Sequence, residues 1–256
     1  MMGKKARISA VTFDLWDTLI IDDSDEPKRA AEGMASKARE RRNLVERFLQ
    51  KTEPTPRALI DVAYDTLDAA FRHVWYNQDV TWTVSERLSL LLAGLKRELL
   101  PEDFEELVRL HEEMELMVRP DLVSGVTETL RTLKDRYRLG VISDAIFSPG
   151  RVLRQILSDY GAAGYFDSFV FSDEAGRSKP HPLTFEKAAA DLGVKLDEIV
   201  HIGDREEKDV RGPHSVGARA VLFTAVKDRG SQNTKADAVC ENIADLPRIL
   251  DGMNSH

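Results

Sequence analysis

Two short apolar runs, far apart in the sequence, each end at a carboxylate. Arg7 to Phe13 runs into Asp14, and Ile199 to Ile202 runs into Gly203-Asp204. Runs of this length and composition predict buried strands. Ligands of an open parallel sheet bind beyond the carboxyl ends of its strands, where both acids would then lie. The two carboxylates therefore predict a single, metal-assisted site.

Beyond Val123, short β-rich runs alternate with helical segments. This alternation predicts a parallel sheet with crossover helices on both of its faces. The expected strands in this part are Arg138 to Ile142, Ser168 to Phe171, Ile199 to Ile202 and Arg219 to Phe223. Because the strand before Asp14 belongs with this set, the expected fold class is α/β, with a Rossmann-like doubly wound parallel sheet as its core.

The stretch between the first strand and Val123 has a helical pattern throughout. Apolar residues recur at helical spacing from Leu59 to Val74 and from Val84 to Leu99. The breaks at Pro54, Pro56, the turn from Asn77 to Thr83, and Pro101 divide the stretch into about four helices. We therefore expect residues 22–119 to form an inserted α-helical bundle, and residues 1–21 and 120–256 to form the core.

The first of these helices is expected over Lys28 to Lys51. Its apolar stripe is interrupted by two basic residues, Arg41 and Arg42. Such arginines commonly lay their stems along a bundle rim and keep their heads in water.

Composition narrows the classes of partner. The chain is 42% apolar and 31% charged, with a formal net charge of -8, so it offers no basic field for nucleic acid. Its one cysteine, Cys240, cannot form an internal disulfide, and the basic first residues lack the apolar run of a signal peptide. The longest apolar runs are only strand-length, which predicts no membrane span. We expect a cytoplasmic monomer or homodimer that binds neither nucleic acid nor membrane.

Four short motifs follow one another along the chain. They are Asp14 with Thr18, Ser143 at the end of a strand, Lys179 in Lys179-Pro180-His181-Pro182, and Gly203-Asp204 with Asp209. This order resembles the haloacid dehalogenase-like (HAD) hydrolase superfamily, in the subgroup that carries an α-helical cap between the first and second motifs. The resemblance implies that residues 22–119 are such a cap.

The resemblance also implies roles for these residues. Asp14 would be the nucleophile of a phosphatase and form an aspartyl-phosphate that water hydrolyses. Thr18 would hold the nucleophile loop by hydrogen bonding, while Ser143 and Lys179 would grip the phosphoryl oxygens. The chemistry is coherent, because a carboxylate that attacks a phosphate dianion needs positive charge nearby.

The same resemblance implies a magnesium site. Its ligands would be Asp14, the backbone carbonyl of Trp16 and Asp204, with Asp209 in support around the metal-bound waters. Hard divalent cations prefer such oxygen ligands.

Simpler interpretations exist for several of these side chains. Ser143 has the alternative of capping the helix that follows its strand, and Asp144 is interpreted as a local cap or turn residue. Asp209 has the alternative of being a surface acid. His201 is interpreted as an ordinary strand residue.

Trp16 departs from the family pattern, which has Asp at this position. That Asp normally protonates the leaving group, and such general acid help is worth about 10²- to 10⁴-fold in rate. Without it, the expected substrate is a small phosphorylated metabolite with a good leaving group, such as an acyl phosphate or a phosphoanhydride. Asp17 is an improbable substitute, because adjacent residues of an extended segment point to opposite sides.

Two alternatives to a phosphatase remain open. An aromatic residue at position 16 and an arginine in the first inserted helix, where Arg41 and Arg42 lie, are features of 2-haloacid dehalogenases. Those enzymes use no metal, however, and carry Ser and Asn where this chain has Gly203-Asp204. The other alternative is a binding protein that keeps the fold and has little activity.

Overall fold

The computed structural model describes residues 6–255 and contains one parallel sheet of six strands. The strands are β1 (Ala10–Phe13), β2 (Arg138–Ser143), β3 (Ser168–Phe171), β4 (Ile199–Gly203), β5 (Arg219–Phe223) and β6 (Ala238–Cys240). Their order in the sheet is β3-β2-β1-β4-β5-β6, with every neighbouring pair parallel. β1 and β4 are therefore neighbours, which brings the residues after them to one edge of the sheet.

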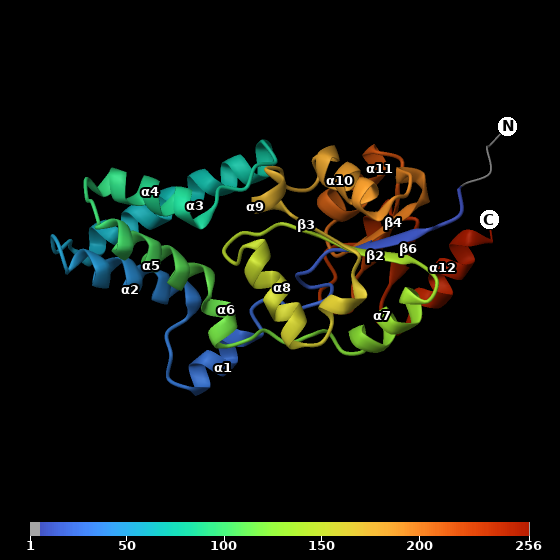
Figure 1. Cartoon of the computed structure of the whole chain (residues 1–256), viewed down its shortest axis with the longest axis horizontal. Helices are drawn as coiled ribbons and strands as arrows, with labels where there is room; N and C mark the ends of the chain where they lie inside the picture. The colour runs from blue at the N-terminus through green and yellow to red at the C-terminus, as the bar shows by residue number, and fades with distance from the viewer. Residues whose placement is uncertain (1–5, 256) are drawn as a thin grey trace.

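Helices cover both faces of this sheet (Figure 1). They are α7 (Val126–Lys134), α8 (Gly150–Asp159), α9 (Ser172–Ala175), α10 (Pro182–Leu192), α11 (Gly212–Ser215) and α12 (Leu246–Asn254). Single turns connect them: η1 (Ala163–Tyr165), η2 (Leu196–Glu198), the π-helical η3 (Glu206–Arg211), η4 (Ser231–Asn233) and η5 (Ile243–Asp245). The apolar residues of α7, α8 and α12 pack on one face, and those of α10 on the other. The predicted doubly wound α/β fold is confirmed.

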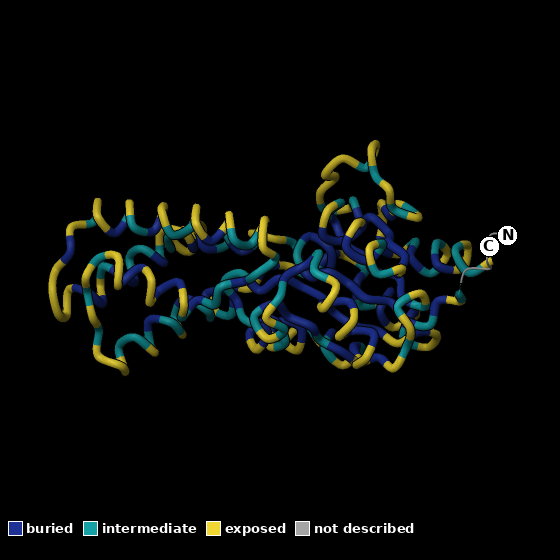
Figure 2. The backbone as a smooth tube through the Cα atoms, turned by 90° about the horizontal axis from the view of Figure 1, so that it is seen from above, coloured by how far each residue is buried: buried dark blue, intermediate teal, exposed yellow. Residues whose placement is uncertain are grey.

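A helical insertion lies between β1 and β2. Its helices are α1 (Asp25–Ala31), α2 (Lys37–Leu49), α3 (Arg57–Asn77), α4 (Val84–Leu95), α5 (Pro101–Glu112) and α6 (Met114–Met117). We call α2 to α5 the helical bundle; it projects from the sheet and encloses its own apolar core, with exposed residues along its outer side (Figures 1 and 2). The predicted starts of α4 and α5 are confirmed, with a capping box between Thr83 and Glu86 and with Pro101 in the first turn.

Two local predictions are wrong. The expected helix from Lys28 to Lys51 is broken between α1 and α2, because Gly33 adopts a left-handed backbone (φ 72°) and the Ser36 side chain caps α2. The edge strand β6 was missed, since it has only three residues, of which only the last is buried.

The chain enters and leaves the insertion through two paired segments. The N–H of Ile21 donates to the carbonyl of Asp121 at 2.8 Å, and the N–H of Val123 donates to that of Leu19 at 2.9 Å. These two bonds flank an antiparallel bridge between Ile20 and Leu122. The insertion thus joins the core through a short two-stranded neck.

A buried lysine at the base of α2 holds the insertion together near this neck. Lys37 Nζ lies 2.8 Å from Asp25 Oδ1 of α1 and 3.0 Å from Glu115 Oε1 of α6. Burial acts to lower the pKa of Lys37, but the carboxylates of Glu115 and Asp25 raise it overall. The lysine therefore stays charged and ties three helices of the insertion to one another.

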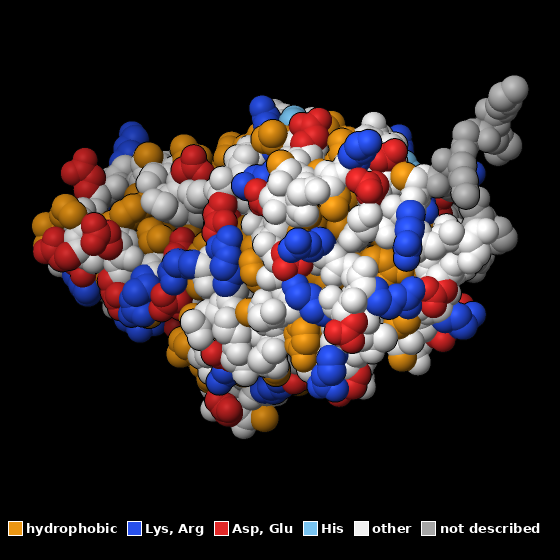
Figure 3. Space-filling model, turned by 45° about the vertical axis from the view of Figure 1, so that its right-hand side comes forward, with side chains coloured by type: hydrophobic (Ala, Val, Ile, Leu, Met, Phe, Trp, Pro, Cys, Tyr) orange, Lys and Arg blue, Asp and Glu red, His pale blue; other side chains and the backbone are white. Residues whose placement is uncertain are grey.

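On the face shown in Figure 3, acidic and basic side chains are interspersed. Between residues 6 and 255, no helix has the length and apolar character needed to cross a membrane.

The bundle buries one neutral histidine. The ring of His111 in α5 lies 2.8 Å, through Nδ1, from the carbonyl of Leu107 and 2.7 Å, through Nε2, from the hydroxyl of Tyr64. A carbonyl only accepts, so Nδ1 carries the proton and Nε2 accepts from the tyrosine. Burial lowers the pKa of His111 to about 3.

This histidine makes stability depend on pH. The unfolded chain binds a proton at His111 below about pH 6.5, whereas the folded chain does not, so stability falls as the pH drops below 6.5. The contribution is about 1.4 kcal/mol per pH unit in that range. Urea unfolding at pH 7.5 and 5.5 should therefore show a smaller loss for His111→Phe than for the parent. The exposed His73→Gln serves as control and should behave as the parent; equal losses in all three proteins would contradict the assignment.

Candidate active site

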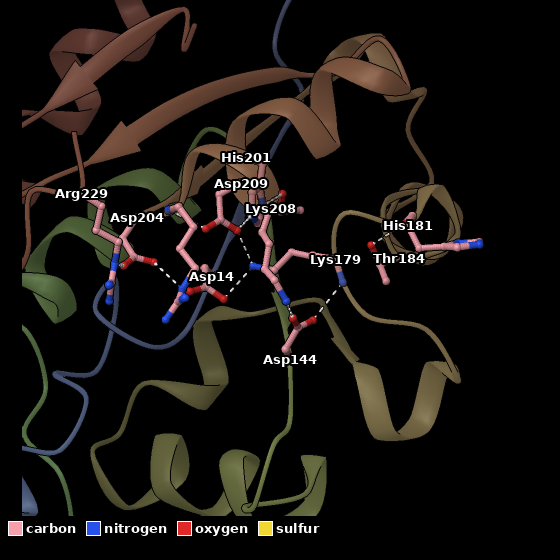
Figure 4. Close-up of polar contacts among 12 residues, drawn as sticks. Asp14, Asp144, Lys179, His181, Thr184, His201, Asp204, Lys208, Asp209 and Arg229 are labelled. Atoms are coloured by element: carbon pink, nitrogen blue, oxygen red, sulfur yellow. Dashed lines mark hydrogen bonds and ion pairs between the residues drawn. The ribbon is translucent and has the colours of Figure 1, made fainter. Parts of the chain in front are cut away.

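Asp14 follows β1 directly and is the centre of the site. Its N–H donates to the carbonyl of Ile202 in β4 at 2.8 Å, which fixes the residue between the two neighbouring strands. Its Oδ1 accepts a hydrogen bond from Lys179 Nζ at 2.7 Å, and the same ammonium donates to Asp209 Oδ1 at 2.6 Å (Figure 4). All three side chains are buried. The fold thus brings together three residues that the sequence separates widely.

Asp209 is held at the centre by backbone geometry. A β-carbon added at Gly203 would lie 2.4 Å from Asp209 Cγ, so only glycine fits before Asp204. The N–H of Arg205 donates to Asp209 Oδ2 at 2.9 Å. Asp209 lies in the π-helical turn η3, a type of turn that recurs at functional sites. The alternative of a surface acid is wrong for this residue.

A buried histidine supports Asp209 from behind. His201 Nε2 lies 3.1 Å from Asp209 Oδ1, and His201 Nδ1 lies 2.9 Å from Thr12 Oγ1. Burial, and then the charge of Lys179, lower the pKa of His201 to about 4, so the ring is neutral near pH 7. An ionised Asp209 can only accept, and therefore Nε2 carries the proton while Nδ1 accepts from Thr12.

The interpretation of His201 as an ordinary strand residue missed this contact. Strand alternation was the signal that could have found it, because it places His201 on the same face of β4 as Gly203.

Three carboxylates form a group that could hold a metal ion. Oxygens of Asp14, Asp204 and Asp209 all lie within 4.8 Å of one another. Asp204 Oδ1 is buried and has no hydrogen-bond partner among the described residues, while its Oδ2 contacts Arg229 Nε. A buried carboxylate oxygen without a donor is costly unless a cation compensates it. The donor set therefore fits a hard divalent cation.

The pKa values of the carboxylates also fit a divalent cation at this position. Burial raises the pKa of Asp14 to about 7; Lys179 acts to lower it, but Asp209 and Asp204 act to raise it. Asp209 keeps its charge, because Lys179 and the bond from His201 hold its pKa below the ordinary value in spite of burial. The described side chains alone thus leave Asp14 partly protonated at neutral pH, and further positive charge beside it would keep it ionised.

Ser143 and Thr18 have free hydroxyl groups. The oxygens of both side chains are buried and have no hydrogen-bond partner among the described residues. Helix α8 begins only at Gly150, so the alternative that Ser143 caps a helix is wrong. The hydroxyl of Thr18 thus forms no hydrogen bond within the nucleophile loop, although the backbone N–H of Thr18 donates to the carbonyl of Leu15 at 3.4 Å. Backbone bonds hold that loop instead, with the N–H groups of residues 19 and 20 donating to the carbonyl of Leu15 at 2.8 and 2.9 Å.

Asp144 connects the core to the bundle. Its Oδ1 accepts from the N–H of Lys179 at 2.9 Å, and its Oδ2 accepts from Lys208 Nζ and, at 3.0 Å, from Trp75 Nε1 of α3. Lys208 Nζ also lies 3.4 Å from the centroid of the Trp75 ring, a cation–π contact. The interpretation of Asp144 as a local turn residue is wrong. No local sequence pattern indicates a contact between residues so distant in the chain.

A cavity of about 410 Å³ lies between the bundle and the edge of the sheet. Asp14, Ser143 and Lys179 line it from the core, and Arg41 and Trp75 line it from the bundle. The carboxylate of Asp14 thus faces a partly open cavity, and groups of the bundle face whatever binds there.

Trp16 and Asp17 lie differently with respect to this cavity. Trp16 lines it, and its carbonyl accepts no hydrogen bond from the described residues. Asp17, in a left-handed backbone conformation (φ 53°), does not line it. Its carboxylate lies 2.7 Å from Arg229 Nη2 and accepts from the N–H of Asp22 at 3.1 Å. These contacts support the expectation that Asp17 does not replace the missing acid.

Three solved structures share the fold over 96% of the chain. A HAD phosphatase from Thermococcus onnurineus matches with a TM-score of 0.64 and 23% identity, covering 99% of that chain. A 2-haloacid dehalogenase from Pseudomonas syringae matches with 0.61 and 24%, also covering 99%. The HAD-hydrolase YfnB from Bacillus subtilis, bound to magnesium, matches with 0.60 and 18%, covering 100%. At these identities the likeness bears on the fold alone.

Sequence similarity adds the family. A glyceraldehyde 3-phosphate phosphatase from Pyrococcus furiosus is 27% identical over 247 residues, which are 96% of this chain and 92% of that protein. Residues 8–217 match the haloacid dehalogenase-like hydrolase family. The chain therefore belongs to the haloacid dehalogenase-like hydrolases, with phosphatases among its relatives.

Proposed function

We propose that this protein is a magnesium-dependent phosphatase that acts through an aspartyl-phosphate on Asp14. Its substrate is a small phosphorylated metabolite with a good leaving group. The observation that carries the proposal is the contact of Lys179 with Asp14 and Asp209, beside an Asp204 oxygen that lacks a donor. The named activity of the Pyrococcus furiosus relative, on a triose phosphate, supports a small phosphorylated metabolite as substrate. The good leaving group rests on Trp16 alone, because a triose phosphate is an alkyl ester.

The side chains of the site fit this chemistry. Asp14 attacks phosphorus, and the leaving group departs on the opposite side of the phosphoryl group. Lys179, which is fixed between Asp14 and Asp209, neutralises the phosphoryl oxygens, and the free hydroxyl of Ser143 donates to one of them. Thr18 stays a predicted part of the nucleophile loop.

Asp14, Asp204 and the Trp16 carbonyl would hold magnesium, with Asp209 in support. When bound, the ion supplies the positive charge that offsets the repulsion between carboxylate and phosphate.

We further propose that residues 22–119 act as a cap on a core formed by residues 1–21 and 120–256. The paired neck segments at Ile20 and Leu122 would then be the hinge, since they are where the chain crosses between the two parts. The contact between Trp75 and Asp144 would hold the cap against the core.

A 2-haloacid dehalogenase is the second candidate. The aromatic side chain of Trp16 and the Arg41 guanidinium, which both line the cavity, favour it. The Asp204 oxygen that lacks a hydrogen-bond donor favours the phosphatase, because a metal-free reaction leaves this buried oxygen without a ligand.

The first prediction concerns magnesium binding. A bound cation favours the charged form of Asp14, whose pKa is about 7 without it, so binding should release protons. Calorimetric titration with Mg²⁺ in two buffers of different ionisation enthalpy should show this release at pH 6.5 and much less at pH 8.5. Asp14→Asn should lower this release strongly, leaving only the part due to Asp204, whose pKa is also raised by burial, whereas Asp22→Asn, a change of another acid that lines the cavity, should keep it. No release at pH 6.5 would contradict the assignment of Asp14 as a ligand.

The second prediction concerns the nucleophile. Asp14→Asn should lower kcat on an aryl phosphate by at least about 10³-fold, because the amide cannot attack phosphorus while filling nearly the same volume. Chelation of the metal should abolish turnover by the parent. Consumption of 2-chloropropionate by the parent in the presence of chelator, without phosphatase activity, would establish the dehalogenase instead.

The third prediction concerns Trp16. Without a general acid, charge accumulates on the departing oxygen, so log kcat/KM should fall steeply with leaving-group pKa across a series of phosphate esters. Trp16→Asp should flatten this dependence by accelerating alkyl esters selectively. A shallow dependence in the parent would show that another acid works in the cavity, and Asp22, whose exposed side chain lines the cavity, would be the next residue to change.

A further inference from the structure

The cavity has five cationic side chains in its wall. These are Lys37, Arg41, Lys179, Arg205 and Lys208. Four of the five lie within 4.0 Å of a carboxylate: the partners include Asp25 for Lys37, Asp14 for Lys179, Asp204 for Arg205 and Asp144 for Lys208. Arg41 is the exception, since no described carboxylate lies within this distance of it.

Arg41 is buried in spite of this. Only 7% of the residue is exposed, and its Nε has no hydrogen-bond partner among the described residues. Its guanidinium carbon lies 3.4 Å from the centroid of the Phe147 ring, under which Arg87 also stacks at 4.2 Å. The ring orients the guanidinium but cannot neutralise it, and a second cation beside it adds repulsion. A buried, unneutralised guanidinium is costly unless a ligand supplies the missing anion.

The nearby acids are engaged elsewhere. Glu115 also lines the cavity, but its two oxygens accept from Lys37 Nζ and from the hydroxyl of Ser148. The neighbouring arginine of α2 shows the contrast: Arg42 lies 2.6 Å from Asp65 and 3.6 Å from Asp61, both on α3. Arg42 is thus neutralised at the rim of the bundle, whereas the adjacent Arg41 faces the cavity without a carboxylate partner among the described residues.

We propose that Arg41 binds a carboxylate carried by the leaving group of the substrate. The proposal rests on the phosphatase function above and narrows it to phosphorylated carboxylic acids. A carboxylate matches the bidentate donors of one guanidinium and carries a single negative charge. A second phosphate would bring more negative charge into a wall that already includes Asp22, Asp23 and Glu26.

Two esters of matched size test the proposal. One is 4-(carboxymethyl)phenyl phosphate and the other is its amide, 4-(carbamoylmethyl)phenyl phosphate, so the leaving groups differ mainly in the distal charge. The parent should prefer the carboxylate in kcat/KM by about 10- to 100-fold, the range expected for hydrogen bonds to a charged group. Arg41→Met should bring this ratio close to one, and Arg42→Met should keep it. Arg41→Lys keeps the positive charge but loses the bidentate donors, so its kcat/KM ratio should lie between those of the parent and Arg41→Met. If Arg41→Met does not fold, this ratio for Arg41→Lys tests the proposal.

The outcomes separate this proposal from the function on which it rests. A parent that hydrolyses both esters equally, or an Arg41→Met protein that keeps the full preference, would overturn the role of Arg41 and leave the phosphatase intact. If neither ester is hydrolysed, the proposed function fails. The role of Arg41 can then be tested by calorimetry, by comparing the affinities of the non-hydrolysable 4-(phosphonomethyl)phenylacetate and of its amide. Tighter binding of the acid, lost in Arg41→Met, supports the carboxylate site, and equal binding excludes it.

Discussion

The ammonium of Lys179 between Asp14 and Asp209 is the interaction on which the site depends. Breaking a buried ion pair by removing one partner costs about 3–5 kcal/mol, so this group holds the ends of β1 and β4, the turn η3 and the loop before α10 in one arrangement. Burial acts to lower the pKa of Lys179, but Asp14 and Asp209 raise it overall, and the lysine stays charged. The two acids are not equivalent, however. Asp209 has further donors in His201 and the backbone, whereas Asp14 accepts from the lysine alone among residues 6–255, which supports the proposal that Asp14 is the nucleophile.

The fold and the centre of the site could be predicted because both follow from local patterns. Apolar runs marked the five longer strands, and the parallel order of β1 and β4 then required the residues after them to meet. The partners of these residues could not be predicted in this way. His201 and Arg229 reach the site through side chains whose directions depend on tertiary packing, and the break at Gly33 depends on one left-handed residue inside a helical pattern.

Under the proposed function, Trp16 and Arg41 would both restrict the leaving group of the substrate. With no acid at position 16 to protonate the departing oxygen, the stability of the leaving group would become decisive. The guanidinium of Arg41, which lines the same cavity, would favour negative charge on that leaving group. Enol, aryl and acyl phosphates that carry a carboxylate meet both demands, whereas a neutral sugar phosphate meets neither.

The loop after β2 connects the sheet edge at Ser143 with the bundle at Arg41. Ser143 ends the strand, Asp144 binds Trp75 of α3, and Phe147 packs against the apolar core of the bundle beneath Arg41. One short segment therefore carries both the hydroxyl that is proposed to bind the phosphoryl group and the ring that orients the guanidinium. Because protein interiors are packed closely, a displacement of the bundle is transmitted to both. Substrate contacts at Arg41 would thus be felt at Ser143, so that recognition of the leaving group and placement of the phosphoryl group depend on a single loop.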